Sequence, residues 1–335
     1  MNHSQRRRFL IASGALLVTC LARAQVTGRI PSMGSLSTYP APPKGRVHAT
    51  VVKKVIELGW REGDTIRVER AYGNGNPDRL PEMVAGLIAK NVDVIWAADA
   101  DAAVAAARAT KTIPIVFFGV AFAVEQGLAD SLSRPGRNAT GVSFYPSADL
   151  VGKKLEVLRQ VAPKVSRVAL LVSEDAVPTV SGSGFKQPYV SVENAASRLK
   201  LNLRAHVVRV ASDLDAVFAS IVQSRAQAVA TIGTMLLWRE RQRIVDFVNS
   251  RRLPSAFGLD EFAEAGGLLS YGPAWTEMLA HSFDYVDKIF HGAKPADLPI
   301  EQPTKYELVL NQKTAKALGI NFPPSVLVRA DRIIE

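Results

Sequence analysis

The sequence predicts an α/β fold of two Rossmann-like lobes, each a parallel sheet flanked by helices. Short apolar runs alternate with helix-period segments along most of the 335 residues, which is typical of a parallel sheet covered on both faces. The length suits two domains of roughly 150 residues each. In addition, a strand, a helix and a proline-containing strand ending in Phe-Gly occur at residues 91–119 and again at 226–258. This weak internal repeat indicates two similar lobes, with one large sheet as the alternative.

The first 24 residues are typical of a secretory signal peptide and stand outside the predicted fold. Three arginines at 6–8 precede an apolar run at 9–21, and Ala22-Arg23-Ala24 places small residues where a signal peptidase reads them. We therefore expect cleavage after Ala24 and a periplasmic location. The arginines also fit a twin-arginine export signal. A membrane anchor is less favoured because the run is short, and so is lipidation of Cys20, because the residue before it is bulky.

Composition and charge narrow the function classes. The chain is 47% hydrophobic and 7% aromatic, which is a globular composition. Cys20 is the only cysteine, so the mature chain is expected to have no disulfide, thiolate nucleophile or cysteine metal site. Removal of the four signal-peptide arginines lowers the formal charge from +10 to +6, and the remaining charges are interspersed. Nucleic-acid binding is therefore not expected.

The first half of the chain predicts alternating strands and helices. The expected strands lie at 29–37, 66–72, 92–97, 113–118 and 140–144, and the expected helices at 47–56, 77–90 and 100–110. Pro31 weakens the first strand, and the segment 29–37 is expected to lead from this strand into a loop at Gly34-Ser35. Pro77 suits the first turn of its helix.

The second half repeats this pattern. Helices are expected at 151–161, 188–200, 213–225 and 238–251, and strands at 168–172, 203–210, 228–232 and 253–257. A polar turn at 260–265 and an apolar run at 268–271 then lead to a helix that opens at Trp275. Further short strands are expected at 298–301 and 308–310, and a short helix at 313–318 that stops at Gly319.

The sequence contains no arrangement of residues typical of catalysis or metal binding. His48, His206, His281 and His291 have no metal-ligand spacing. A nucleophile elbow, a phosphate-binding loop and a His-Glu-x-x-His motif are all missing, and the segment at 73–77 lacks the third glycine of a dinucleotide loop. We therefore expect no cofactor, no metal and no catalytic residue. An exported α/β enzyme is the alternative from another class.

The sequence instead favours a binding cleft, because open α/β sheets bind ligands where the carboxyl ends of strands meet loops. Loops after strands of both lobes supply the candidate ligand-binding residues. They are Ser35, Asp99, Gly119 and Phe144 in the first lobe, and Glu174, Thr234, Phe257, Asp260 and Tyr271 in the second.

The roles expected of these residues follow from side-chain chemistry. Ser35 and the helix-start amides near Asp99 suit a ligand carboxylate, whereas Asp99 itself is expected to cap its helix or meet a ligand amine. The rings of Phe144, Phe257 and Tyr271 suit an apolar or aromatic group. The alternative for Phe257 and Tyr271 is that both rings pack in the core, between strand and helix.

Several blocks of sequence carry a resemblance to a known family. They lie at 58–63, 66–69, 78–81, 113–117, 133–141, 264–272, 292–299, 301–308, 311, 313–319 and 329–331. With these blocks the chain resembles the periplasmic substrate-binding proteins of ABC transporters, which have the type I two-lobed fold. Two places depart from the family pattern: the first strand is interrupted by Pro31, and the loop at 177–188 is rich in serine, glycine and proline.

The resemblance implies that three crossing segments join the lobes, near residues 144–147, 271–273 and 299–303. The N-terminal lobe then comprises 25–145 plus 273–300, and the C-terminal lobe comprises 146–272 plus 301–335. The resemblance also implies a monomer that closes its lobes on a small molecule, such as an amino acid or an aromatic or carboxylate compound, and delivers it to an ABC permease at the membrane. A ligand-binding component of a sensor system is the alternative.

Overall fold

The computed structural model describes residues 29–41, 49–144, 148–173, 186–232 and 235–335. The predicted signal peptide, with Cys20, lies outside these residues, as do the candidate ligand-binding residues Glu174 and Thr234. Within the described ranges, no helix is long and apolar enough to cross a membrane.

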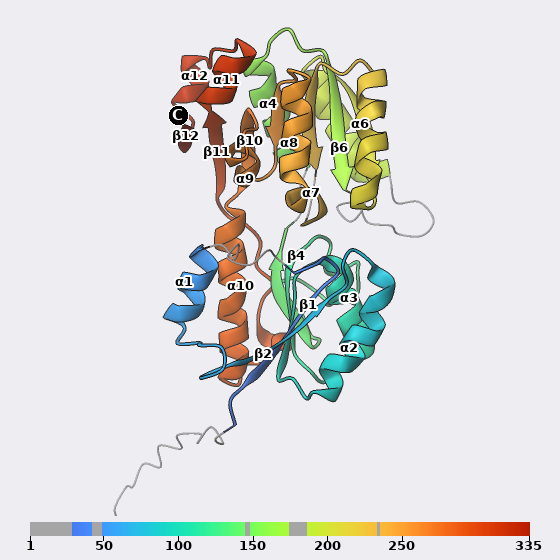
Figure 1. The fold of residues 1–335 in the computed structure, drawn as a ribbon, viewed down its shortest axis with the longest axis vertical. Helices are drawn as coiled ribbons and strands as arrows, with labels where there is room; N and C mark the ends of the chain where they lie inside the picture. Colours follow the sequence, from blue (N-terminus) through green and yellow to red (C-terminus); the bar gives the residue numbers. More distant parts are fainter. Residues whose placement is uncertain (1–28, 42–48, 145–147, 174–185, 233–234) are drawn as a thin grey trace, which may run out of the picture. The chain divides into compact units, whose positions relative to one another are not determined.

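The first sheet has five strands, all parallel, in the order β2-β1-β3-β4-β5. Its strands are β1 (Ser32–Ser37), β2 (Arg67–Tyr72), β3 (Val94–Ala97), β4 (Ile115–Val120) and β5 (Ala139–Ser143). Its helices are α1 (Ala49–Glu57), α2 (Leu80–Ala89), which follows a 3-10 turn at Pro77–Arg79, and α3 (Ala100–Ala109). Helices α2 and α3 contact each other (Figure 1). The central strands are apolar and almost wholly buried, as expected where helices cover both faces.

The second sheet has seven strands, in the order β12-β11-β10-β9-β8-β6-β7. They are β6 (Arg167–Ser173), β7 (Asn202–Val208), β8 (Ala228–Ile232), β9 (Ser255–Phe257), β10 (Leu269–Pro273), β11 (Tyr306–Asn311) and β12 (Arg332–Ile334). From β7 to β10 the strands are parallel and repeat the order of the first sheet. Strand β11 is antiparallel to β10, and β12 is parallel to β11. The repeat predicted from the sequence is therefore confirmed as two sheets, and the single-sheet alternative is wrong.

The helices of the second lobe follow the prediction in most places. They are α4 (Ala148–Val161), α5 (Lys186–Arg198), α6 (Leu214–Gln223) after a 3-10 turn at Ala211–Asp213, α7 (Met235–Arg239), α8 (Arg241–Ser250), α9 (Asp260–Glu264), α11 (Gln312–Leu318) and α12 (Pro324–Leu327). Helix α9 occupies the predicted turn at 260–265, α12 lies where no helix is predicted, and the single helix predicted at 238–251 is divided in two at Glu240. Helix α11 ends at Gly319, whose φ of 72° lies in the left-handed region that favours glycine at a helix end.

The chain passes between the two sheets more than once. After β10, helix α10 (Trp275–Phe290) contacts β3, β4 and β5 and lies beside α1 (Figure 1). After a 3-10 turn at Pro295–Asp297, the Ile300 amide donates to the Leu132 carbonyl oxygen at 2.7 Å, and the chain then enters β11. The strand predicted at 298–301 is wrong, since only a single bridge pairs Glu301 with Val142. The residue boundaries of the two lobes stay a prediction.

The first strand also differs from the prediction, because Gly34 and Ser35 lie inside β1 and not in a loop. Every residue of β1 is buried, and the strand pairs with β2 on one side and β3 on the other. A Cβ atom at Gly34 would lie 3.0 Å from Cδ1 of Leu87, so glycine allows helix α2 to approach the strand closely. Pro31 precedes the strand, so its missing N–H removes no bond of the ladder.

Candidate functional site

Asp99 joins the end of strand β1 to the start of helix α3 in the first lobe. Its carboxylate accepts four hydrogen bonds: from Ser37 Oγ at 3.0 Å, Thr38 N at 2.9 Å, Thr38 Oγ1 at 2.7 Å and Ala102 N at 3.0 Å. The bond from Ala102 makes Asp99 the N-cap of α3. Of the two roles predicted for Asp99, helix capping is the one that the structure shows.

Gly119 and Asp99 line one small cavity. Its other lining residues are Ala98, Ala100, Phe118, Met235 and Trp275. Gly119 has a φ of 70°, and a Cβ atom there would lie 2.8 Å from the Trp275 ring. Glycine is therefore required both by the backbone and by the ring that lies against it. Two residues predicted to bind ligand are thus brought together, and Met235 of α7 adds a wall from the second lobe.

Trp275 is the centre of an aromatic cluster beside this cavity. The Phe118 ring centre lies 4.6 Å from that of Trp275, and the Phe144 ring centre lies 5.8 Å from it, edge to face. Trp275 is buried, and its indole Nε1 has no hydrogen-bond partner among the described residues. Phe144, predicted as a ligand contact, is itself buried here as part of this cluster.

Arg239, at the end of α7 in the second lobe, reaches the segment after β1 in the first. Its Nη2 donates to the Pro40 carbonyl oxygen at 2.9 Å. The guanidinium carbon lies 5.5 Å from the centre of the Tyr39 ring, within cation–π range. Burial lowers the pKa of the Arg239 guanidinium, and the charge of Tyr39 opposes this shift. Among the described residues, no carboxylate lies within ion-pair distance of Arg239.

The remaining candidates are not brought together with this cavity. The Phe257 ring is fully buried and stacks on Phe262, with ring centres 4.5 Å apart. Tyr271 is half-buried and lies 6.4 Å from Tyr306 across the β10–β11 pair. Phe257 matches the core alternative stated for it. Tyr271 is only partly buried and lies beside the neighbouring strand, so its role stays a prediction.

Asp260 and Ser35 also lie apart from the cavity. Asp260 Oδ2 accepts a hydrogen bond from Arg332 Nη2 of β12 at 2.9 Å, which assigns that oxygen to an ion pair at the edge of the second sheet. Ser35 is within β1, paired in register with Arg70 and Trp96. A residue that the sequence places at or after a strand therefore does not always contribute its side chain to the cleft.

Two further buried groups in the second lobe carry shifted pKa values. Lys154 of α4 is almost fully buried, donates to the Thr231 carbonyl oxygen, and has no ion pair within the described residues. Burial lowers its pKa to about 7. Glu261 of α9 accepts from Thr276 Oγ1 at 2.9 Å, and its other oxygen has no partner within the described part of the chain. Burial, assisted by the charge of Asp260, raises the Glu261 pKa to about 7.

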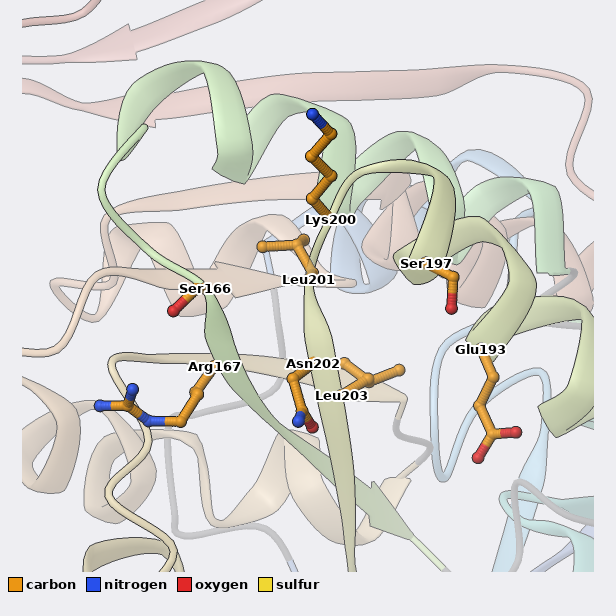
Figure 2. A pocket seen from close by; sticks show the side chains of 8 residues that line it. All are labelled: Ser166, Arg167, Glu193, Ser197, Lys200, Leu201, Asn202 and Leu203. Atoms are coloured by element: carbon orange, nitrogen blue, oxygen red, sulfur yellow. The ribbon is translucent and has the colours of Figure 1, made fainter.

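A wider concavity of the described surface lies elsewhere. It has a volume of about 660 Å³ and is lined by Ser166, Arg167, Glu193, Ser197, Lys200, Leu201, Asn202 and Leu203. These residues lie at the amino ends of β6 and β7 and on α5, the opposite sheet edge from the one where α/β lobes bind ligands. Figure 2 shows the charged ends of Arg167, Glu193 and Lys200 pointing apart. Small-molecule sites need convergent polar groups, so we assign no ligand to this concavity.

The sequence reasoning missed Tyr39, Met235 and Arg239. Tyr39 follows the end of β1, and the other two lie in α7, which follows β8. Their position just after strands was the available signal. The predicted helix begins at Trp238, so the prediction leaves Met235 outside any element and gives Arg239 no binding role. Within the described residues, no group of histidines, cysteines and carboxylates is arranged to hold a metal ion.

Comparison with known proteins identifies the family. The chain matches the family described as ABC transporter substrate binding protein over residues 46–334. It is 22% identical over 269 residues to the tyrosine-binding protein of Clostridioides difficile strain R20291, which covers 80% of this chain and 75% of the relative.

Solved structures share the fold. An ABC domain from Streptococcus pneumonia in complex with L-Trp and a conserved domain protein from Vibrio cholerae each superpose with a TM-score of 0.78 at 22% identity, covering 91% of this chain and 100% of theirs. A ligand-free, open substrate binding protein with adhesive properties from Clostridium difficile gives a TM-score of 0.62 at 20% identity, covering 91% of this chain and 99% of that one. The predicted two-lobed fold is thereby confirmed. Because the family match spans most of its length, the chain belongs to the ABC transporter substrate binding protein family.

Proposed function

We propose that the protein is the extracytoplasmic solute-binding component of an ABC importer. It captures a small molecule between its lobes and delivers it to a membrane permease. The observation that carries this proposal is the family match over residues 46–334. The predicted signal peptide, with cleavage after Ala24, supports a periplasmic location. The bond from Arg239 to the Pro40 carbonyl oxygen supports a binding site between the carboxyl ends of strands from both sheets.

The proposed ligand is an amino acid with an aromatic side chain. One relative is named as tyrosine-binding, and a structure with the same fold holds L-Trp. The small cavity has a volume of about 10 Å³, which leaves no room for such a side chain in the arrangement that the structure shows. Trp275, Phe118 and Met235 in its walls offer apolar and aromatic surface that a ligand would contact once the lobes separate. Asp99, Gly119 and Phe144 lie in or beside this cavity. We retain them in the proposed site with Glu174 and Thr234, which come from the second lobe.

The proposed mechanism is capture by closure. A ligand that contacts both lobes binds more tightly when the lobes are close together. It therefore stabilises this closed arrangement relative to the open one. One structure with the same fold is described as ligand-free and open, which supports a movement of this kind. Hinge closure needs only a few residues in the crossing segments to change their backbone angles. No covalent step is involved.

Calorimetric titration of purified protein with L-tyrosine and with L-tryptophan tests the ligand class. At least one should bind, raise the melting temperature and be recovered chemically unchanged. Conversion of the added compound into a product would contradict the binding role and favour the exported-enzyme alternative. If cells lacking the protein take up the ligand at an unchanged rate, the importer assignment is wrong and the sensor alternative is favoured.

The export step is tested separately. N-terminal sequencing of protein recovered from the cell envelope should begin at Gln25. A chain that begins at Met1 and stays in the cytoplasm would contradict export. A diacylglyceryl group on Cys20 would instead show that the protein is a lipoprotein.

A further inference from the structure

We propose that Arg239 is the residue that binds the carboxylate of the ligand, and that it thereby restricts the ligands of this protein to carboxylates. This inference deepens the proposed function and rests on its assumption that the ligand lies between the lobes. Nothing in the sequence pattern identified Arg239 as a binding residue. The structure assigns it through its position, its burial and its lack of a counter-ion.

The first observation is position. Arg239 lies in the segment after β8, and its guanidinium group contacts Tyr39 and Pro40 in the segment after β1. Both segments follow the carboxyl ends of central strands, one from each sheet. Met235 of the same short helix lines the small cavity with Asp99 and Gly119. Arg239 follows Met235 by four residues, a rise of about 6 Å along α7, so a ligand that contacts Met235 at the mouth of this cavity lies close to the arginine.

The second observation is charge. A partly buried cation is costly unless it is paired. Glu240, the next residue, lies 3.6 Å from Arg243, which also binds Asp215. Asp99 is nearby, but its oxygens already accept four hydrogen bonds. The negative charges of Glu240 and Asp99 partly offset the burial of the guanidinium. No carboxylate of the described residues forms an ion pair with it, and the Pro40 carbonyl oxygen is its only acceptor among them.

The third observation is donor geometry. A guanidinium group presents several N–H donors in a planar fork, which matches the two oxygens of a carboxylate. The bond to Pro40 uses Nη2, and the Tyr39 ring lies near the guanidinium carbon and limits its movement. An arginine held in this way is better suited to a carboxylate than a flexible lysine.

The experiment compares each carboxylate ligand with its uncharged amide. Thermal shift and calorimetry are run with L-tyrosine against L-tyrosinamide and with L-tryptophan against L-tryptophanamide. The panel also contains L-leucine, L-glutamate and benzoate with their amides, and ribose. The wild-type protein should prefer a carboxylate to its amide by at least about tenfold, the scale of a hydrogen bond to a charged group.

Arg239→Gln should abolish that preference, with a loss of about 10- to 100-fold for the carboxylate and little change for the amide. Arg241→Gln is the matched control. Arg241 lies two residues from Arg239 and carries the same charge, but the described contacts of its side chain are with Trp238. The Arg241→Gln protein should therefore keep the preference for the carboxylate. Circular dichroism establishes that each variant is folded. If Arg239→Gln does not fold, Arg239→Lys decides, because an ammonium group lacks the fork and should lower the preference.

The outcomes separate this inference from the ligand class proposed above. Binding of a non-aromatic carboxylate, lost in Arg239→Gln, supports the role of Arg239 and contradicts the aromatic amino acid. Equal binding of a carboxylate and its amide, an unchanged preference in Arg239→Gln or Arg239→Lys, or binding of ribose alone overturns the role of Arg239. Failure of the wild-type protein to bind any carboxylate in the panel overturns it as well.

Discussion

Each lobe has a Phe-Gly pair at a corresponding strand, Phe118-Gly119 in the first lobe and Phe257-Gly258 in the second. The residues packed around these two pairs differ, and this difference shows where the lobes have diverged. Phe118 lies two residues before the end of β4, and Phe257 ends β9. Both rings are fully buried, and each lies against an aromatic ring of the described residues, Phe118 against Trp275 at 4.6 Å and Phe257 against Phe262 at 4.5 Å between ring centres. The repeat in the sequence therefore corresponds to a shared packing arrangement, in which a buried phenylalanine of β4 or β9 contacts a second aromatic ring.

The glycines that follow these rings have different neighbours. A Cβ atom at Gly119 would lie 2.8 Å from the Trp275 ring, whereas a Cβ atom at Gly258 would lie 3.6 Å from Nζ of Lys154. An aromatic ring thus fills the space in the first lobe, and a buried cation fills it in the second. The main buried charge of the first lobe, Asp99, has four donors. The buried carboxylate of the first lobe is therefore fully hydrogen-bonded, whereas the buried Lys154 of the second lobe has no counter-ion among the described residues.

The largest expected effect tests whether the two rings are equivalent. Phe118→Ala and Phe257→Ala should each lower the free energy of unfolding by about 3–5 kcal/mol, the usual cost of deleting a fully buried aromatic ring. Urea denaturation measures both. A Phe257→Ala protein of unchanged stability but weakened ligand binding would contradict the comparison, and would show that this ring lines the cleft, as the sequence first suggested.

The next effect concerns Lys154 and depends on pH. The Lys154 pKa of about 7 in the folded chain is below its ordinary value of 10.5, so the folded state resists protonation. Burial of Lys154 therefore destabilises the folded state by its full amount below about pH 7, and this destabilisation disappears as the pH rises towards 10.5. Lys154→Met should therefore be more stable than the wild type at pH 6, by roughly 2–4 kcal/mol.

The advantage of Lys154→Met should shrink steadily between pH 7 and pH 9.5 in urea denaturation. Lys153→Met is the matched control, because Lys153 is exposed and lies 3.4 Å from Glu156. Its stability should differ from the wild type by less than about 0.5 kcal/mol at every pH. A constant difference for Lys154→Met across the range would mean that the ammonium group is paired in solution.

Asp99→Ala should lower the free energy of unfolding by roughly 2–3 kcal/mol. The change removes the N-cap of α3 and leaves donors of Ser37 and Thr38 buried without their acceptor. Asn76→Ala removes a cap that makes one bond at an exposed site, so it should cost about 1 kcal/mol or less. Equal losses in thermal melts of the two variants would contradict the structural role assigned to Asp99.

The smallest effect tests Glu261, whose pKa is raised to about 7 from 4.5. Between pH 4.5 and 7 the folded state retains a proton that the unfolded state has lost, so stability falls as the pH rises through this window. Glu261→Gln should remove the decline and gain roughly 1–2 kcal/mol at pH 8. Glu264→Gln, at an exposed position paired with Arg332, should leave the decline in place. Denaturation at pH 4.5, 6 and 8 distinguishes the two.

The sequence by itself determined the fold class, the repeat and most of the elements. Hydrophobic period and the positions of proline and glycine depend on neighbours within a few residues, and these signals placed the parallel strands, the helix from Trp275 and the stop of α11 at Gly319. Predictions from the sequence were wrong where the neighbouring strands determine the secondary structure of a segment. Gly34 and Ser35 form part of a strand because β2 and β3 flank them, and no local pattern reports this.

Tertiary structure alone decided which candidate side chains meet. Phe257 and Tyr271 follow strand ends in the sequence, but strand pairing turns them towards Phe262 and Tyr306. Arg239 and Tyr39 are 200 positions apart along the chain, and only the folded chain places them together. Charge balance is likewise a property of three-dimensional neighbours, because a cation is costly or harmless according to what surrounds it. The local sequence therefore specifies each lobe, and the packed structure specifies the site.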